Sequence, residues 1–83
     1  MSRRVELTRA AMKDIQKLGV ADQRVVVAAL EAFSAGTMGD VKKLRGYDPP
    51  AWRLRVGRFR VVYRIEGEAV IVDRISDRHD VYR

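Results

Sequence analysis

Five arginines lie close together in the C-terminal half of the sequence, in a stretch from residue 51 to residue 65 that contains no acidic residue. They are Arg53, Arg55, Arg58, Arg60 and Arg64. The guanidinium group is always charged near neutral pH, and its planar fork of N–H donors matches the oxygens of a phosphate group. Arginines at this density, without carboxylates among them, predict a site that binds a polyanion, and the polyanion that we expect is RNA.

The spacing of these arginines fits a tight β-hairpin. Residues 51–56 and 59–65 are rich in β-branched and aromatic side chains, and only Gly57 and Arg58 separate them. A two-residue turn places Arg55 opposite Arg60 and Arg53 opposite Val62, with Arg64 further along the same face. The other face then carries six side chains that we expect to pack against helices: Trp52, Leu54, Val56, Phe59, Val61 and Tyr63.

Like charges directly across a strand pair destabilise it, so folding alone does not explain this arginine face. We interpret the face as a preformed anion site in which three guanidinium groups converge and phosphate oxygens supply the missing counter-charge. The alternative is an ordinary surface network, in which carboxylates from Asp73 or from the region of Asp77 and Asp80 pair with the arginines.

The N-terminal half predicts a strand and a helical hairpin. Val5 and Leu7 alternate with charged residues, as in a short strand, and Thr8 is placed to cap a first helix that ends at Gly19. The apolar stripe of this helix is Ala11, Ile15 and Leu18. Asp22 is the predicted N-cap of a second helix, with Gly36 as its terminator. The apolar face of the second helix is Val25, Val26, Ala29, Leu30 and Phe33.

Residues 37–50 contain Gly39, Gly46, Pro49 and Pro50 and show no clear period, so we predict a loop with a short turn around residues 42–44. Residues 69–75 form the last predicted strand. The order is therefore β-α-α-β-β-β. The predicted fold class is α+β, an antiparallel sheet with a helical hairpin packed on one face, in one domain spanning residues 1–83.

Composition limits the classes of function. The chain has 83 residues and a net charge of +6, enough for one modest core. Residues 1–41 carry six basic and five acidic side chains, whereas residues 42–83 carry eleven and six, so the second half supplies most of the charge. With no cysteine and no apolar run near the length of a membrane span, we expect a cytoplasmic protein without disulfides, thiolate metal sites or membrane contact.

Other chemistry-bearing residues give weaker signals. His79 is the one histidine and lies in a polar tail, which is typical of an exposed surface residue. Tyr82 follows Arg78 by four residues. It fits two interpretations: a site residue beside the arginine face, or a tyrosine at the edge of the core. The carboxylates are scattered, so the sequence predicts no metal site and no cofactor.

Two runs carry a more specific pattern: KKLRGYDPPAWRLRVGRFRVVYRIEG, residues 42–67, and RISDRHDVYR, residues 74–83. They resemble the RelE/ParE superfamily of bacterial and archaeal toxins, and the resemblance covers nearly the whole chain. Its most specific parts are the loop at residues 43–46, the hairpin and the Arg78-x-x-x-Tyr82 element. The helices match only in order and length.

For the RelE branch, the resemblance implies a toxin that enters the ribosomal A site and cleaves mRNA by attack of a ribose 2′-hydroxyl on the adjacent phosphate. It implies a cognate antitoxin that silences the toxin, the ribosome and mRNA as further partners, and no metal. The candidate catalytic residues, by position, are Arg53, Arg55, Arg60, Arg78 and Tyr82. The further candidate RNA-binding residues are Lys42, Lys43, Arg45, Arg58 and Arg64.

The first-strand pair departs from the RelE pattern, where it is lysine. Arginine is a poor general base because it stays protonated, so Arg53, Arg55 and Arg60 are predicted to hold the scissile phosphate. Activation of the 2′-hydroxyl then falls to Tyr82, with Arg78 at the leaving group. The departure leaves open a ParE-type toxin, which shares the fold but inhibits DNA gyrase without a nuclease site, or a member that only binds RNA or an antitoxin. The presence of Arg78 and Tyr82 beside the strand arginines favours RNA cleavage.

Overall fold

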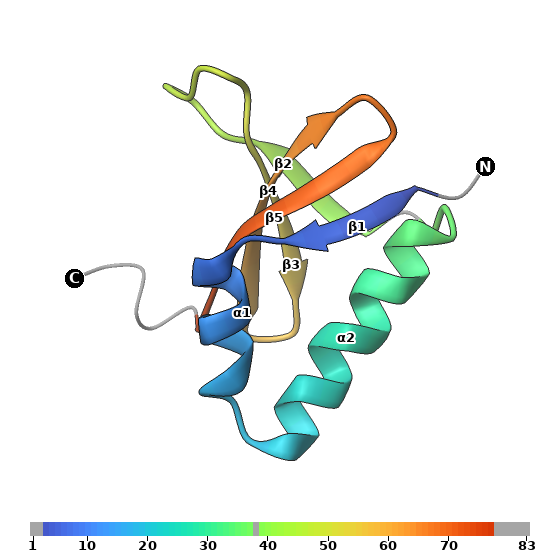
Figure 1. The fold of residues 1–83 in the computed structure, drawn as a ribbon, viewed down its shortest axis with the longest axis vertical. Helices are drawn as coiled ribbons and strands as arrows, with labels where there is room; N and C mark the ends of the chain where they lie inside the picture. The colour runs from blue at the N-terminus through green and yellow to red at the C-terminus, as the bar shows by residue number, and fades with distance from the viewer. Residues whose placement is uncertain (1–2, 38, 78–83) are drawn as a thin grey trace.

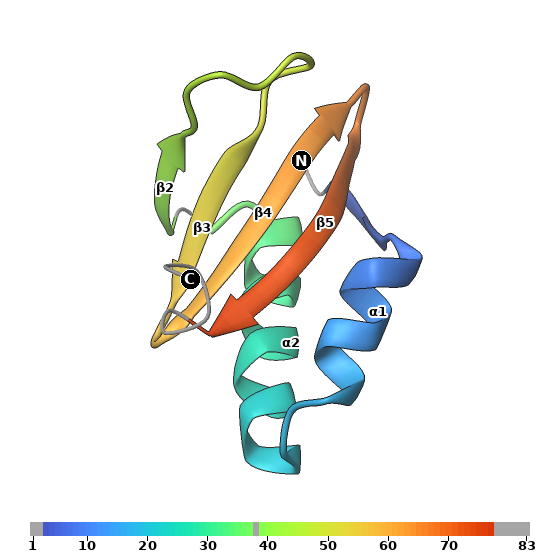
Figure 2. The ribbon, with the colours of Figure 1, turned by 90° about the vertical axis from the view of Figure 1, so that its left-hand side faces the viewer.

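The computed structural model describes residues 3–37 and 39–77, and in them two helices cover one face of a five-stranded sheet (Figure 1, Figure 2). In chain order the elements are β1 (Arg4–Leu7), α1 (Arg9–Gln16), α2 (Val20–Ser34), β2 (Asp40–Lys43), β3 (Trp52–Val56), β4 (Phe59–Glu66) and β5 (Ala69–Asp77). This arrangement confirms the predicted α+β class with a helical hairpin on one face of the sheet. Neither helix in the described ranges is long and apolar enough to cross a membrane.

The sheet is mixed rather than antiparallel throughout, with the strand order β1-β5-β4-β3-β2. Strand β1 pairs with β5 in parallel, and the three other strand pairs are antiparallel. The prediction of an antiparallel sheet was wrong for β1, because the alternation of Val5 and Leu7 shows that a strand forms but not which strand it joins or in which direction.

Strand β2 lies where the sequence predicted a loop. Three of its four residues are exposed, and Val41 is its one apolar side chain. A short, charged edge strand has no second apolar residue to reveal a period of two, so pairing with β3 decides its conformation. The consequence for function is large, because β2 adds Asp40 and Lys42 to the sheet face that carries the arginines.

The helix predictions hold in part. The Thr8 hydroxyl caps α1 by accepting a hydrogen bond from the Ala11 N–H at 3.2 Å, as predicted. Helix α2 begins earlier than predicted, with Gly19 as its N-cap, so Asp22 lies inside the first turn rather than at the cap. Val25 is 51% exposed and does not belong to the buried face, because it lies about 100° around the helix from Val26.

The predicted hairpin register is confirmed. Val56 pairs with Phe59, Leu54 with Val61 and Trp52 with Tyr63 across a turn whose first residue, Gly57, has φ of 57°, as two-residue hairpin turns with a leading glycine require. These six side chains face the helices, and burial raises the pKa of the Tyr63 hydroxyl. The ring of Tyr63 stacks on Trp52 and meets Phe33 of α2 edge-on, with centroids 6.1 and 5.2 Å away.

Candidate functional site

The arginine face holds a basic pocket of about 340 Å³, formed by β2, the following loop, β3 and β4. Its lining residues are Lys42, Lys43, Leu44, Arg45, Arg53 and Arg60. Five of the six are cations, and none of the described residues that line it is acidic. A concave surface with this lining is suited to an anion, because several N–H donors reach one bound group.

The register explains how these cations meet. In one row across the sheet Lys42 lies opposite Arg53, and in the neighbouring row Arg55 lies opposite Arg60. Both pairs place like charges directly across a strand pair, which is unfavourable in the absence of a counter-charge. Pairing of β2 with β3 therefore concentrates the cations beyond what the hairpin alone predicted.

Asp40 supplies part of the counter-charge. Its carboxylate lies 3.3 Å from a terminal nitrogen of Arg53 and 3.9 Å from Nε of Arg55. The prediction that the strand arginines are unpaired was therefore wrong for both. The reason is that their acidic partner comes from β2, outside the residue range over which the sequence contains no acid.

Arg53 has a side chain that is more buried than those of Arg55, Arg58 and Arg64. Its side chain is only 12% exposed, and its buried Nε has no hydrogen-bond partner among the residues that the structure describes. A buried N–H group without an acceptor costs about 1–3 kcal/mol, and more when it is charged. Arg53 therefore lines the basic pocket as a nearly buried cation that pairs with the exposed carboxylate of Asp40.

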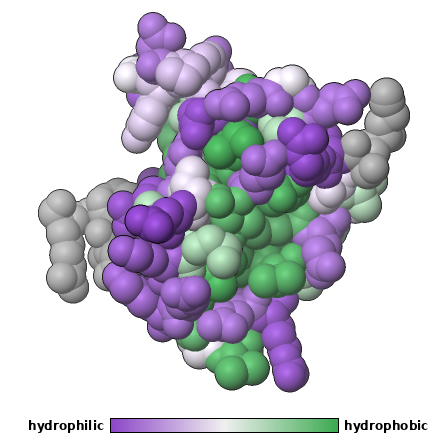
Figure 3. Space-filling view, viewed as in Figure 1, coloured by the Kyte–Doolittle hydropathy of each residue, from purple (hydrophilic) through white to green (hydrophobic). Residues whose placement is uncertain are grey.

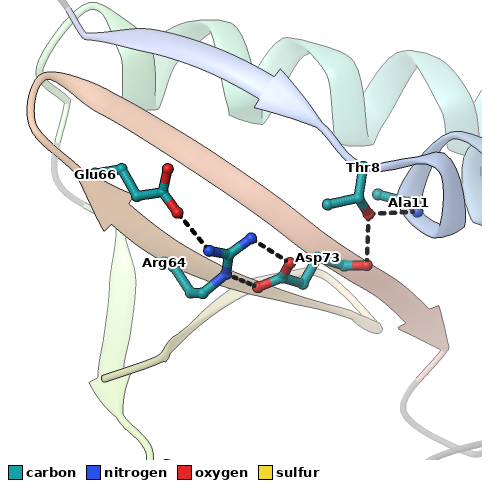
Figure 4. Close-up of polar contacts among 5 residues, drawn as sticks. All are labelled: Thr8, Ala11, Arg64, Glu66 and Asp73. Atoms are coloured by element: carbon teal, nitrogen blue, oxygen red, sulfur yellow. Dashed lines mark hydrogen bonds and ion pairs between the residues drawn. The ribbon is translucent and has the colours of Figure 1, made fainter. Parts of the chain in front are cut away.

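Two of the candidate RNA-binding arginines, Arg64 and Arg58, form ion pairs within the fold. Arg64 donates to both oxygens of Asp73, at 2.7 and 3.0 Å, and also contacts Glu66 (Figure 4). These bonds raise the pKa of Arg64, and the hydrogen bonds that it donates to Asp73 contribute most. Arg64 is thus in the ordinary surface network that the sequence offered as an alternative, and Asp73 is its partner.

Arg58, in the hairpin turn, lies 2.9 Å from Asp22 of α2 and 2.9 Å from Asp77 of β5. Its guanidinium also sits 5.0 Å from the centre of the Phe59 ring. These contacts tie the turn to the helical hairpin and to the last strand. Neither Arg58 nor Arg64 lines the basic pocket.

The remaining candidates divide between two places. Arg55 is 47% exposed and does not line the basic pocket, although it lies opposite Arg60. Arg78 and Tyr82 lie outside the described residues, as does His79. The described chain ends on β5, where Ser76 pairs with Arg60 and Asp77 with Phe59.

One charged group that the sequence did not single out is Asp14 of α1, which is 8% exposed. It accepts hydrogen bonds from the Arg74 side chain and from the buried Ile75 N–H, both at 2.9 Å. Burial raises the pKa of Asp14. The hydrogen bonds from Arg74 and Ile75, together with the charges of Arg74 and Lys17, lower the pKa by more than burial raises it, so the net shift is downward. Asp14 therefore anchors α1 to β5 just before the described chain ends.

An apolar groove of about 660 Å³ lies on another part of the surface, between β1 and the two helices (Figure 3). Its apolar lining is Val5, Leu7, Met12, Ile15, Val27 and Leu30. Met12 and Val27 are 47% and 41% exposed, which is high for side chains of this kind. The groove shares no residue with the basic pocket.

Comparison with solved structures identifies the fold as that of the RelE toxins. A chain of the RelBE2 toxin–antitoxin complex from Mycobacterium tuberculosis is similar with a TM-score of 0.79 and 26% identity, over 93% of this chain and 99% of that chain. A chain of the archaeal RelE–RelB complex from Pyrococcus horikoshii is similar with a TM-score of 0.77 and 24% identity, over 94% of this chain and 97% of that chain. A mutant of the E. coli toxin RelE in the free state is similar with a TM-score of 0.77 and 20% identity, over 98% of this chain and 88% of that chain.

The family follows from the sequence match. The family model for the ParE toxin of type II toxin–antitoxin systems matches residues 5–82. The chain therefore belongs to this family and is a toxin of the RelE/ParE superfamily. Comparison with curated protein sequences finds no match.

Proposed function

We propose that this toxin is a ribosome-dependent mRNA endonuclease and that its basic pocket holds the scissile phosphate. The observation that carries the proposal is Arg53, a cation that is 12% exposed and has a buried Nε without an acceptor in the described residues. Four more cations line the same pocket. Preformed donors of this kind stabilise the charge that develops on a phosphate during nucleophilic attack.

In the proposed reaction the ribose 2′-oxygen forms a bond to the adjacent phosphorus, and the bond from phosphorus to the 5′-oxygen of the next nucleotide breaks. The products are a 2′,3′-cyclic phosphate and a 5′-hydroxyl. Arg53 and Arg60, which line the basic pocket, hold the phosphate, and Arg55 adds its charge from the position opposite Arg60. Tyr82, as the tyrosinate, accepts the proton of the 2′-hydroxyl. Arg78 stabilises the negative charge on the leaving 5′-oxygen, which then takes a proton from water to become the 5′-hydroxyl. Both residue roles rest on the resemblance of the sequence to the RelE pattern.

The test is to induce the wild type and the Arg60→Ala variant in a bacterial host and to map the 5′ ends of transcripts. We expect codon-phased cuts within translated regions for the wild type and none for Arg60→Ala. Arg24→Ala is the matched control, because it removes an exposed arginine of α2 that does not line the basic pocket, and it should cut as the wild type does. Full cleavage by Tyr82→Phe would remove Tyr82 from the role of base.

A second candidate is inhibition of DNA gyrase without catalysis. The match to the ParE toxin model favours it, as does arginine in place of the lysine pair of the RelE pattern. Plasmid supercoiling followed in the same cultures separates the two candidates. Intact transcripts with disturbed supercoiling would make the basic pocket a protein-docking surface.

We further propose that a cognate antitoxin silences this toxin by covering the arginine face with an acidic segment. The relatives from M. tuberculosis and P. horikoshii were crystallised as complexes with their antitoxins, which supports a partner of this kind. A segment rich in carboxylates that folds on binding complements the cations of β2 and β3.

A further inference from the structure

The loop between β2 and β3, which contributes Leu44 and Arg45 to the basic pocket, also presents an aromatic side chain to solvent. Tyr47 is 55% exposed, whereas every other aromatic residue in the described part of the chain is buried or half-buried. No hydrogen bond, ion pair or ring contact joins Tyr47 to another described residue. The Tyr47 ring therefore contributes no such contact to the described part of the fold.

The loop is held in place at its base. The Leu44 N–H donates to the Ala51 carbonyl at 2.9 Å, and Ala51 is 3% exposed. Leu44 and Arg45 both line the basic pocket, and Gly46 turns the chain with φ of 80°, a conformation that favours glycine. Tyr47 follows Arg45 by two residues, so their Cα atoms are at most about 7 Å apart.

The lining of the pocket explains why a neighbouring ring matters. Its side chains are five cations and a leucine, which suit a phosphate group but include no aromatic ring for a nucleobase. Proteins that bind single-stranded nucleic acid combine a basic groove along the backbone with aromatic rings on which the bases stack. Tyr47 is placed to complete such a pair of functions.

We propose that Tyr47 is a base-stacking residue that holds the nucleobase next to the phosphate in the basic pocket. The proposal rests on the proposed function, because it needs RNA in that pocket. The stacking is independent of base identity, since every base has a π face. Tyr47 thus positions the RNA strand, and the cations hold its phosphate.

The experiment measures binding of two fluorescently labelled oligonucleotides to the purified toxin by anisotropy. Both have the 2′-O-methyl backbone, which blocks attack by the 2′-oxygen, and one of them is abasic at every position. The variants are Tyr47→Ala, Tyr47→Leu, Tyr47→Phe and Arg53→Ala. Tyr47→Leu keeps an apolar side chain without a ring, and Tyr47→Phe keeps the ring without the hydroxyl.

We expect Tyr47→Ala and Tyr47→Leu to weaken binding of the oligonucleotide with bases by about five- to a hundredfold, with no effect on the abasic one. Tyr47→Phe should bind both as the wild type does, and Arg53→Ala should weaken both. Wild-type affinity of Tyr47→Ala for both, with loss in Arg53→Ala, would overturn the stacking role alone and leave Tyr47 to a protein contact. Undiminished binding by Arg53→Ala would instead overturn the phosphate site and the proposed function.

Discussion

Replacing Asp14 tests how helix α1 is fixed to β5, the strand that precedes the Arg78-x-x-x-Tyr82 element. The Asp14 carboxylate accepts from the Ile75 N–H at 2.9 Å and from two nitrogens of Arg74 at 2.9 and 3.3 Å. Ile75 is 3% exposed, so its N–H has no access to water as a replacement acceptor. The side chain of Arg74 is 63% exposed, so its ion pair with Asp14 is screened by solvent.

These exposures set the magnitudes. Asp14→Ala leaves a buried N–H without an acceptor, at a cost of about 1–3 kcal/mol, and the screened ion pair adds no more than about 1 kcal/mol. We therefore expect Asp14→Ala to lower the free energy of unfolding by about 1–4 kcal/mol and Tm by about 5–30 °C. Arg74→Ala keeps the bond from Ile75 and should cost about 1 kcal/mol or less.

The assay is urea denaturation followed by circular dichroism and by the fluorescence of Trp52, repeated over a range of pH. The folded protein holds the pKa of Asp14 below its usual 3.8, so the carboxylate stabilises the fold at pH values above the unfolded pKa. That stabilisation is lost as the pH falls through the lower, folded pKa. The difference between the wild type and Asp14→Ala should therefore be constant near neutral pH and shrink only below about pH 4.

Two results would refute this reasoning. Equal losses in Asp14→Ala and Arg74→Ala would show that the ion pair, and not the bond to the strand, holds α1 in place. A difference that already shrinks between about pH 7 and pH 5 would show that burial dominates and raises the pKa of Asp14. Asp14→Asn is the matched control, because it keeps an oxygen acceptor for the Ile75 N–H and removes only the charge.

Two further predictions concern the arginine face. Asp40→Asn removes the carboxylate that lies 3.3 Å from Arg53. We therefore expect RNA, measured by anisotropy, to bind about three- to tenfold more tightly at low salt. Weaker binding would mean that Asp40 instead orients Arg53. Affinity of the toxin for its antitoxin, measured by calorimetry, should fall by at least about tenfold from about 0.05 M to about 0.5 M salt, and an affinity independent of salt would contradict docking on this face.

The hairpin could be predicted from the sequence in full because its turn has only two residues. A turn of fixed length sets the register, and the register decides which side chains share a face. The placement of Arg55 opposite Arg60 and the packing of Trp52 and Phe59 on the face toward the helices followed from this local rule. Residues far apart in the chain were not needed for any of these conclusions.

What the sequence did not reveal depends on distant partners. The carboxylates of Asp40 and Asp22 reach the arginines from β2 and α2, and no local pattern shows that these elements lie beside the hairpin. The sequence offered Asp73 as a partner of the arginines but did not show which arginine it meets. Asp73 reaches Arg64 at an irregularity in the pairing of β4 with β5, which shifts the register between Val62 and Tyr63. Tyr47 could have been found by a different signal. It is an aromatic residue between Gly46 and Pro49, in a predicted loop that contributes nothing to the core.

The structure sorts the strand arginines by what surrounds them, although the sequence presents them as one group. Arg64 and Arg58 each contact two carboxylates, which accounts for their charge within the fold. Arg53 and Arg55 share Asp40, and Arg53 also faces Lys42 across the strand pair. A cation that is nearly buried and faces a second cation is poorly explained by stability, because both features cost free energy and the Asp40 carboxylate that pairs with it is exposed and shared with Arg55. A ligand that brings negative charge into the basic pocket offsets both costs, and this is why the pocket, rather than the arginine content as a whole, supports the proposed RNA site.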